Sequence, residues 1–263
     1  MSEAIAKTSP LLPIASLWHR EVVRFLRQRS RVVGALGTPV VFWVLIGSGL
    51  RNSFKTSGDS GMNYMEYAFP GTLAMIVLFT AIFSMISVIE DRREGFLQAV
   101  LVSPAGRSAI VLGKVLGCST LALVQATAFL LLAPLIGVSL SVSAVVMTVG
   151  VLIVVSVGLS GLGLLIAWPM DSTQGFHAVM NLVLLPMWLL SGAFFPASGA
   201  SRWVGWVMIA NPLTYGVSAL RHAMYWGRPD GEAPMSFAVS LGVSIAFAVI
   251  MIQLSLWVVT KRK

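Results

Sequence analysis

The chain has 263 residues, of which 57% are hydrophobic and only 11% are charged, and its formal net charge is +8. Soluble domains usually carry about 25% charged residues, so this composition excludes a soluble globular protein and predicts an integral membrane protein. No folded basic domain is present to suggest nucleic acid as a partner; we expect the basic residues to orient the chain and to contact anionic lipid headgroups.

The N-terminal segment, residues 1–31, contains an amphipathic pattern between Ser16 and Ser30. Its apolar face is formed by Trp18, Val22, Phe25 and Leu26. Its basic side is formed by Arg20, Arg24, Arg27 and Arg29. The pattern predicts a helix in the cytoplasmic interface with its apolar face in the acyl boundary. An ordinary basic flank before the first span is the alternative.

Six apolar segments are each long enough to cross a hydrocarbon core of about 30 Å. They run approximately over residues 32–50, 68–89, 110–138, 142–168, 176–195 and 236–260. The sequence therefore predicts one all-α transmembrane domain over residues 32–260, followed by a basic tail, residues 261–263. Because cytoplasmic loops hold an excess of lysine and arginine, the thirteen of eighteen basic residues on the side of the termini predict that both termini are cytoplasmic.

A charged island, EDRREGFLQAVLVSPAGR, separates the second and third spans. Its apolar stripe is formed by Phe96, Leu97, Val100 and Leu101. The spacing predicts a short helix whose first turn carries Asp91 and Glu94, where acidic residues suit the helix dipole. After the helix ends, Lys114 is expected to extend toward the cytoplasmic surface. Either a solvated surface helix or a docking element for a cytoplasmic partner fits this composition.

The region between the fifth and sixth spans, residues 190–227, is too apolar for a free loop. The pair Asn211 and Pro212 breaks any helix there, and Tyr215 belongs to the aromatic residues expected at headgroup level. The sequence predicts two short helices that enter the outer leaflet and return, because irregular backbone at membrane depth needs surrounding protein or water.

Signatures of catalysis are absent. The sequence contains no HExxH, GxSxG or GxxxxGK[ST] motif and no metal-ligand spacing, and its three histidines, His19, His177 and His222, are scattered. We therefore expect no catalytic residue, metal or cofactor on this chain, and in particular no phosphate loop for ATP hydrolysis.

The segment EDRREGFLQAVLVSPAGRSAIVLGKVLG resembles the first cytoplasmic loop of type 2 ABC exporter permeases, the family of bacterial drug-resistance and nodulation-factor export permeases. Two later segments, DSTQGFHAVMNLVLLPMWLLSGAFFP and NPLTYGVSALRHAMYWG, are also similar to that family. With the six spans, the resemblance covers essentially the whole chain.

The resemblance implies an all-α half-transporter in the plasma (inner) membrane. Its interfacial helix and its coupling helix, in the first loop, would rest on a separate ATPase subunit, which would bind ATP and Mg. Two permeases, the second being another copy or a related chain, and two ATPases would form one transporter. A pair of outer re-entrant helices would lie between the last two spans.

The resemblance also assigns roles to residues. Those expected to couple to the ATPase are Arg92, Arg93, Glu94, Gly95, Phe96, Leu97, Val100, Leu101, Ser103 and Pro104. The interfacial helix is represented by Trp18, Arg20, Arg24 and Phe25, and the outer region by Asn211, Pro212 and Tyr215. A cargo path is expected along Phe42, Trp43, Met180, Asn181 and Leu184, for which a lipid-facing position or interhelical packing is the alternative.

The function that follows is export of a lipophilic or amphipathic molecule from the cytoplasm or inner leaflet, driven by the partner's ATP hydrolysis. The alternative is a membrane scaffold or assembly factor that docks a partner without transport.

Overall fold

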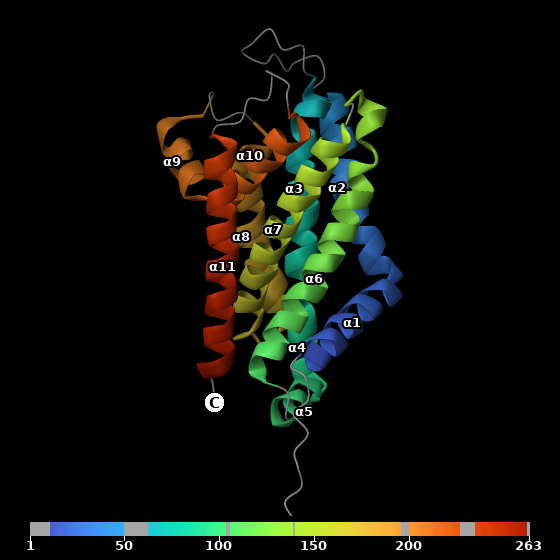
Figure 1. The fold of residues 1–263 in the computed structure, drawn as a ribbon, viewed down its shortest axis with the longest axis vertical. Coiled ribbons are helices and arrows are strands. Elements are labelled where there is room, and N and C mark those ends of the chain that lie inside the picture. The colour runs from blue at the N-terminus through green and yellow to red at the C-terminus, as the bar shows by residue number, and fades with distance from the viewer. Residues whose placement is uncertain are drawn as a thin grey trace, which may run out of the picture.

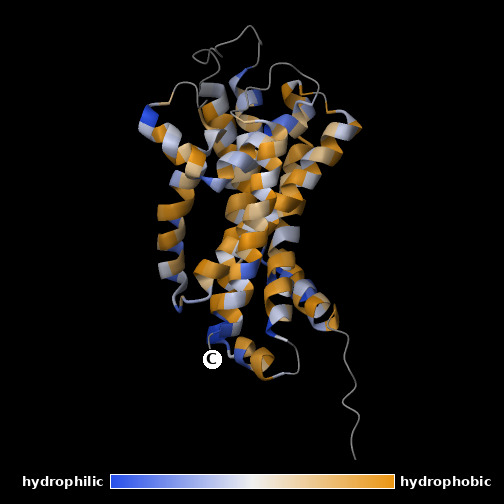
Figure 2. Ribbon diagram, turned by 60° about the vertical axis from the view of Figure 1, so that its left-hand side comes forward, coloured by the Kyte–Doolittle hydropathy of each residue, from blue (hydrophilic) through white to orange (hydrophobic). Residues whose placement is uncertain are grey.

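The computed structural model describes residues 11–49, 63–103, 106–138, 140–195, 200–226 and 235–261. All regular elements within these residues are helices, and six of the helical stretches are long and apolar enough to cross a membrane. The prediction of an all-α membrane protein with six spans is confirmed. Figure 2 shows that the long helices are hydrophobic over most of their length, with hydrophilic residues gathered toward their ends.

The described part of the chain begins with α1 (Leu11–Arg27), which crosses the side of the bundle, and continues into α2 (Arg29–Gly49), the first span. The second span consists of α3 (Tyr64–Phe83) and α4 (Ile86–Arg93), separated by a break at Ser84 and Met85. The short helix α5 (Phe96–Val102) follows at the end of the bundle where α11 also ends (Figure 1).

The third span is α6 (Arg107–Leu130) with the 3-10 turn η1 (Ala133–Ile136), and the fourth is α7 (Val142–Ala167). The fifth, α8 (Thr173–Trp188), ends in the π-helical turn η2 (Leu189–Ala193). Two short helices, α9 (Arg202–Ala210) and α10 (Pro212–Met224), precede the sixth span, α11 (Phe237–Lys261).

The helix α3 forms the centre of the bundle and is buried along nearly its whole length. It packs against α2, α6, α7 and α8 (Figure 1). Small residues allow the closest helix contacts: a Cβ atom added to Gly113 would lie 2.6 Å from the Leu17 Cβ, and one added to Gly161 would lie 2.9 Å from the Met251 Cβ. These glycines therefore seat α1 on α6 and α11 on α7 within one chain.

The face of α1 that contacts the protein differs from the predicted one. Leu17, Glu21 and Phe25 are buried, whereas Trp18 and Leu26 are 37% and 56% exposed. The prediction that Phe25 belongs to the lipid-facing side is wrong, because α6 covers that side of the helix. The location of α1 at a membrane surface stays a prediction.

Candidate functional site

A cluster of charged side chains joins α1, α4 and α6 at the α5 end of the bundle. Asp91 is fully buried and accepts hydrogen bonds from Arg20 (Nη2 to Oδ1, 2.6 Å) and Arg24 (Nη1 to Oδ1, 2.7 Å). The Lys114 ammonium also donates to Asp91. Burial disfavours the charged guanidinium, but the hydrogen bond and the charge of Asp91 outweigh it and raise the pKa of Arg20 above its ordinary value.

Lys114 is 1% exposed and has a second carboxylate partner in Glu21, with Nζ 2.6 Å from Oε1. Ser87 donates to the other Glu21 oxygen at 2.7 Å. The expectation that Lys114 extends to the surface is wrong, because two acidic residues from other helices neutralise it inside the protein. An unpaired charge buried here would lower the stability of the fold by roughly several kcal/mol. The two carboxylates therefore make a buried lysine possible at this position.

We call Arg20, Glu21, Arg24, Ser87, Glu90, Asp91 and Lys114 the Asp91 cluster. Arg24 completes it by contacting Glu90 at 2.8 Å. The cluster therefore holds three basic and three acidic side chains that compensate one another. It ties the N-terminal helix to two spans.

The end of α4 is also attached to the turn between α7 and α8. Arg92 donates to the Met170 carbonyl at 2.9 Å, to the Trp168 carbonyl and to the Asp171 carboxylate. Arg93 donates from Nε to the Asp171 carbonyl at 3.0 Å. The end of α4 is therefore attached to the turn that joins the fourth and fifth spans.

The turn between α4 and α5 differs from the predicted helix. Asp91 lies in α4, Glu94 caps the end of α4, and α5 begins only at Phe96. Gly95 separates the two helices with φ of +78°, in the left-handed region, which residues with a side chain rarely adopt. The prediction that Asp91 and Glu94 occupy the first turn of the short helix is wrong for this reason.

The predicted apolar stripe of α5 faces the protein. Leu97 is buried, and Val100 and Leu101 are half-buried. The Arg20 guanidinium lies over the Phe96 ring, with its Cζ atom 3.7 Å from the ring centroid. Ser103 closes the helix by donating to the Val100 carbonyl at 2.7 Å. The exposed side of α5 consists of Gln98, Ala99 and Val102, next to Glu94. Pro104 lies outside the described residues.

Replacing Gly95 with alanine is expected to lower the free energy of unfolding by about 1–2 kcal/mol, because a Cβ atom is strained in the left-handed region. A Cβ there has no neighbour within 4 Å, so the cost comes from the backbone alone. Asparagine tolerates this conformation better than alanine does. Denaturation of Gly95→Ala and Gly95→Asn in micelles checks this; equal stability of Gly95→Ala and the parent would contradict it.

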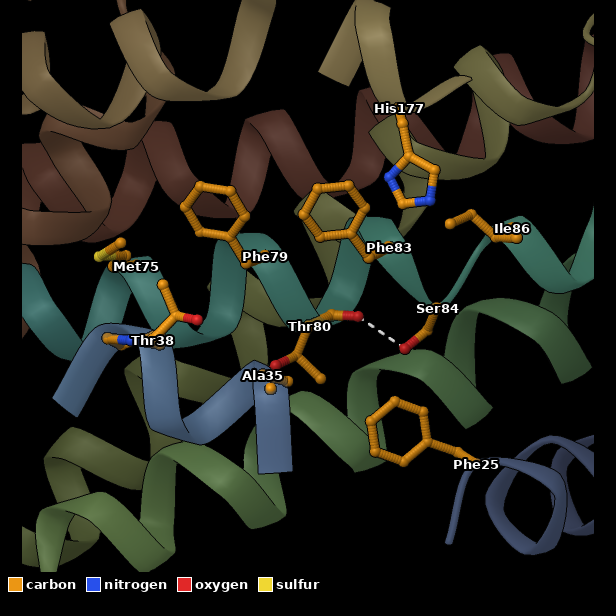
Figure 3. A pocket seen from close by; sticks show the side chains of 12 residues that line it. Phe25, Ala35, Thr38, Met75, Phe79, Thr80, Phe83, Ser84, Ile86 and His177 are labelled. Carbon is orange, nitrogen blue, oxygen red and sulfur yellow. Dashed lines mark hydrogen bonds between the residues drawn. The ribbon is translucent and has the colours of Figure 1, made fainter. Parts of the chain in front are cut away.

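A pocket of about 360 Å³ lies between α2, α3 and α8, with Phe25 of α1 at one end. Phe79 and Phe83 of α3 stack at 5.5 Å along its wall, and His177 of α8 approaches Phe83 (Figure 3). Thr80 and Ser84 also line the pocket. Sequence patterns did not single out this lining, because the aromatic residues of α3 are indistinguishable from ordinary span residues.

On the other side of the pocket, α2 and α8 meet through aromatic rings. Phe42 contacts Trp188 edge to face at 5.4 Å, and Phe194 lies 6.5 Å from Phe42. These rings bring α2 and α8 into contact beyond the pocket, toward η2.

The five predicted path residues do not line this pocket. Trp43 is buried between Phe69 and Phe129, and Met180 and Leu184 are fully buried. Asn181 is exposed and Phe42 is half-buried. The structure brings Phe42 to the aromatic contact beyond the pocket. The assignment of all five to a cargo path stays a prediction.

In the region predicted to lie on the outer side, Asn211 ends α9 and starts α10. Its Oδ1 accepts from the Leu213 N–H at 3.0 Å, and its Nδ2 donates to the Met187 carbonyl at 2.6 Å. Pro212 occupies the first position of α10, where its missing N–H is harmless. The Tyr215 hydroxyl donates to the Ile209 carbonyl at 2.9 Å. The predicted break between two short helices is confirmed.

Comparisons with known proteins agree with this architecture. The family described as "ABC-2 type transporter" matches residues 13–225. The chain belongs to this family. It is a membrane permease subunit of an ABC exporter.

Relatives extend over nearly the whole chain. Nodulation protein J of Rhizobium leguminosarum bv. viciae is 22% identical over 250 residues, 94% of this chain and 93% of its own length. The daunorubicin resistance ABC transporter permease protein DrrB1 of Streptomyces coeruleorubidus is 21% identical over 92% of this chain and 84% of its own length. The transport permease ycf38 of Cyanophora paradoxa is 22% identical over 88% of this chain and 82% of its own length.

Proposed function

We propose that a separate ATPase subunit docks on the exposed side of α5 and drives this permease. The observation that carries the proposal is the position of α5 at one end of the bundle (Figure 1), together with the exposure of one of its faces. Glu94 is 60% exposed and Val102 is 86% exposed, whereas the opposite side of the helix packs inward. A short helix with an exposed face and a charged end suits a groove on a partner.

Two sets of contacts would transmit a displacement of α5 to the membrane spans. The Asp91 cluster links α4 to α1 and α6, and the contacts of Arg92 link α4 to the turn between α7 and α8. ATP and Mg²⁺ would be bound by the partner. Closure of the ATPase subunits would then move the helices as packed bodies relative to one another.

The cargo of the exporter would be lipophilic or amphipathic and would come from the cytoplasm or inner leaflet. The pocket supports this, because its lining is largely apolar and it lies toward the α5 end of the bundle. Phe42 and Trp188 are in contact beyond the pocket, toward the opposite end. The position of the pocket supports entry of the cargo from the α5 side.

The placement of the chain in the inner membrane, with both termini cytoplasmic, is part of the proposal. Support comes from the end of α11 lying at the same end as α5 (Figure 1) and from the bias of thirteen of eighteen basic residues toward that side. A second copy of the permease would complete the cargo path; the exposed apolar residues Leu182 and Leu185 of α8 support such a contact beside the pocket.

The test is to purify the tagged protein from its native membrane in mild detergent, to identify the proteins that accompany it, and to measure ATPase activity. Glu94→Ala is expected to reduce turnover several-fold while the complex stays assembled, because the change removes one exposed charge beside α5. Arg202→Ala, an exposed charge on α9, is the matched control and is expected to leave turnover unchanged.

Two results would contradict the proposal. One is recovery of the permease in several detergents without any nucleotide-hydrolysing subunit. The other is an accompanying ATPase whose turnover is the same in the parent and in Glu94→Ala. If the Glu94→Ala complex formed and functioned without ATP turnover, the scaffold function would instead be favoured.

A further inference from the structure

The pocket between α2, α3 and α8 has the size and the lining of a small-molecule site. Its volume of about 360 Å³ falls within the range of about 300–1,000 Å³ that is usual for ligand pockets. The stacked rings of Phe79 and Phe83 provide apolar surface along one wall, and the ring of Phe25 provides it at another side (Figure 3). The body of a ligand here is therefore aromatic or otherwise apolar.

The buried floor of the pocket offers oxygen lone pairs and few donors. Thr80 is 1% exposed and its hydroxyl donates to Gln125 Oε1 at 2.6 Å. Ser84 is 4% exposed and its hydroxyl donates to the Thr80 carbonyl at 2.6 Å (Figure 3). Since a hydroxyl has one proton and two lone pairs, both oxygens remain able to accept from a ligand.

The backbone of α2 adds a third acceptor. Pro39 lies inside the helix and has no N–H, so the Ala35 carbonyl, four residues earlier, lacks its usual helical donor. Both residues line the pocket. Thr38 and His177, which can donate, are exposed at the rim and have access to the surroundings. The polar recognition at the floor thus favours a ligand that donates a hydrogen bond.

Charge is excluded from the lining. None of the twelve residues that surround the pocket in the described part of the chain is Asp, Glu, Lys or Arg. A cation would gain from the aromatic rings but would lose its hydration without a carboxylate partner. An anion would find no lysine or arginine, and the imidazole of His177 is exposed at the rim, away from the floor. Only an uncharged polar group is compensated there.

We propose that this pocket is the cargo-binding site and that it selects an uncharged amphiphile, with a hydroxyl or amide N–H placed against Thr80 and Ser84 and an apolar body against the phenylalanine rings. The proposal rests on the exporter function proposed above, and it names the chemical class of its cargo.

Four probes that share an anthracene ring test the selection: the anthracenyl methanol, its methyl ether, the anthracenylmethyl ammonium and the anthracene carboxylate. Binding to the full chain in lipid nanodiscs is followed by quenching of tryptophan fluorescence, without ATP and without a partner. The alcohol is expected to bind about five- to tenfold more tightly than the ether, because only the alcohol donates to the floor. Both charged probes are expected to bind more weakly than the alcohol.

Variants locate the binding in the pocket. Gly34 lines it, and a Cβ added there has no neighbour within 4 Å. The Gly34→Leu side chain therefore has room to begin, and we expect it to occupy the pocket. This variant is expected to reduce binding of the alcohol to the level of empty nanodiscs. Gly37→Leu, on the same helix with the same free space but outside the lining, is the control and is expected to bind normally.

Ser84→Ala and Thr80→Val are each expected to bring the affinities of the alcohol and the ether closer together. Equal affinities of the two probes for the parent protein would overturn the inference, as would tighter binding of a charged probe or full binding by Gly34→Leu. Each of these results is independent of the Glu94 experiment, because no ATPase is needed for binding; the failure of one proposal is thus distinguishable from the failure of the other.

Discussion

Replacing Asp91 with asparagine is expected to lower the free energy of unfolding by about 3–5 kcal/mol, the range seen when one partner of a buried ion pair is removed. Asp91 is fully buried and compensates Arg20, Arg24 and Lys114 together. After the substitution Lys114 keeps only Glu21 as an acidic partner, and the cluster carries excess positive charge. Unfolding by sodium dodecyl sulfate in mixed micelles, followed by tryptophan fluorescence, measures the loss.

The matched control is Asp171→Asn, which makes the same chemical change in an ion pair at the same end of the bundle. The Asp171 side chain is 85% exposed where it contacts Arg92 at 3.1 Å. An exposed pair contributes at most about 1 kcal/mol, so this variant is expected to stay close to the parent. Losses of similar size in the two variants would show that burial of the Asp91 cluster does not determine its energy.

Gly71→Ala is expected to lower the free energy of unfolding by about 1–3 kcal/mol, as overpacking of a tight interior does. A Cβ atom at Gly71 would lie 2.6 Å from the Ala193 Cβ and 2.7 Å from the Ala193 Cα and carbonyl oxygen. Because two of these contacts are backbone atoms, α3 and η2 must separate. The separation also strains the hydrogen bond from Trp188 Nε1 to the Gly71 carbonyl, 2.8 Å long.

Gly150→Ala on α7 is the control that distinguishes the effect of this close contact on stability from the effect of helix propensity. A Cβ at Gly150 has no neighbour within 4 Å, and both substitutions gain the same preference of about 1 kcal/mol for alanine over glycine in a helix. Gly150→Ala is therefore expected to be neutral or slightly stabilised in the same denaturation experiment. Should Gly71→Ala prove as stable as Gly150→Ala, the close approach of α3 to η2 would not be a constraint.

Several features of the fold followed from local sequence. The six spans depend on length and hydrophobicity, which are properties of each segment by itself. The break at Asn211 and Pro212 depends on a proline that cannot continue a helix. The island between the second and third spans was recognisable because charge is rare in this chain, although its helix begins later than predicted, after the left-handed Gly95.

The candidate site depended more on contacts between distant residues. Lys114 was expected at the surface, yet its partners Glu21 and Asp91 lie 93 and 23 residues away in the chain. Neither carboxylate has a local pattern that marks it as buried. The face of α1 was misassigned for a related reason, since amphipathic periodicity identifies a helix face but not whether lipid or α6 covers it.

By itself, the sequence determined that this chain has six membrane-spanning segments, carries a charged loop between the second and third of them and resembles export permeases. These are properties of composition, periodicity and short motifs. Only the tertiary structure decided which charges are buried together, which side of α5 is exposed, and where α2 and α8 leave a pocket over α3. Those features arise from pairs of residues far apart in the chain, whose contact is set by helix packing rather than by any single segment.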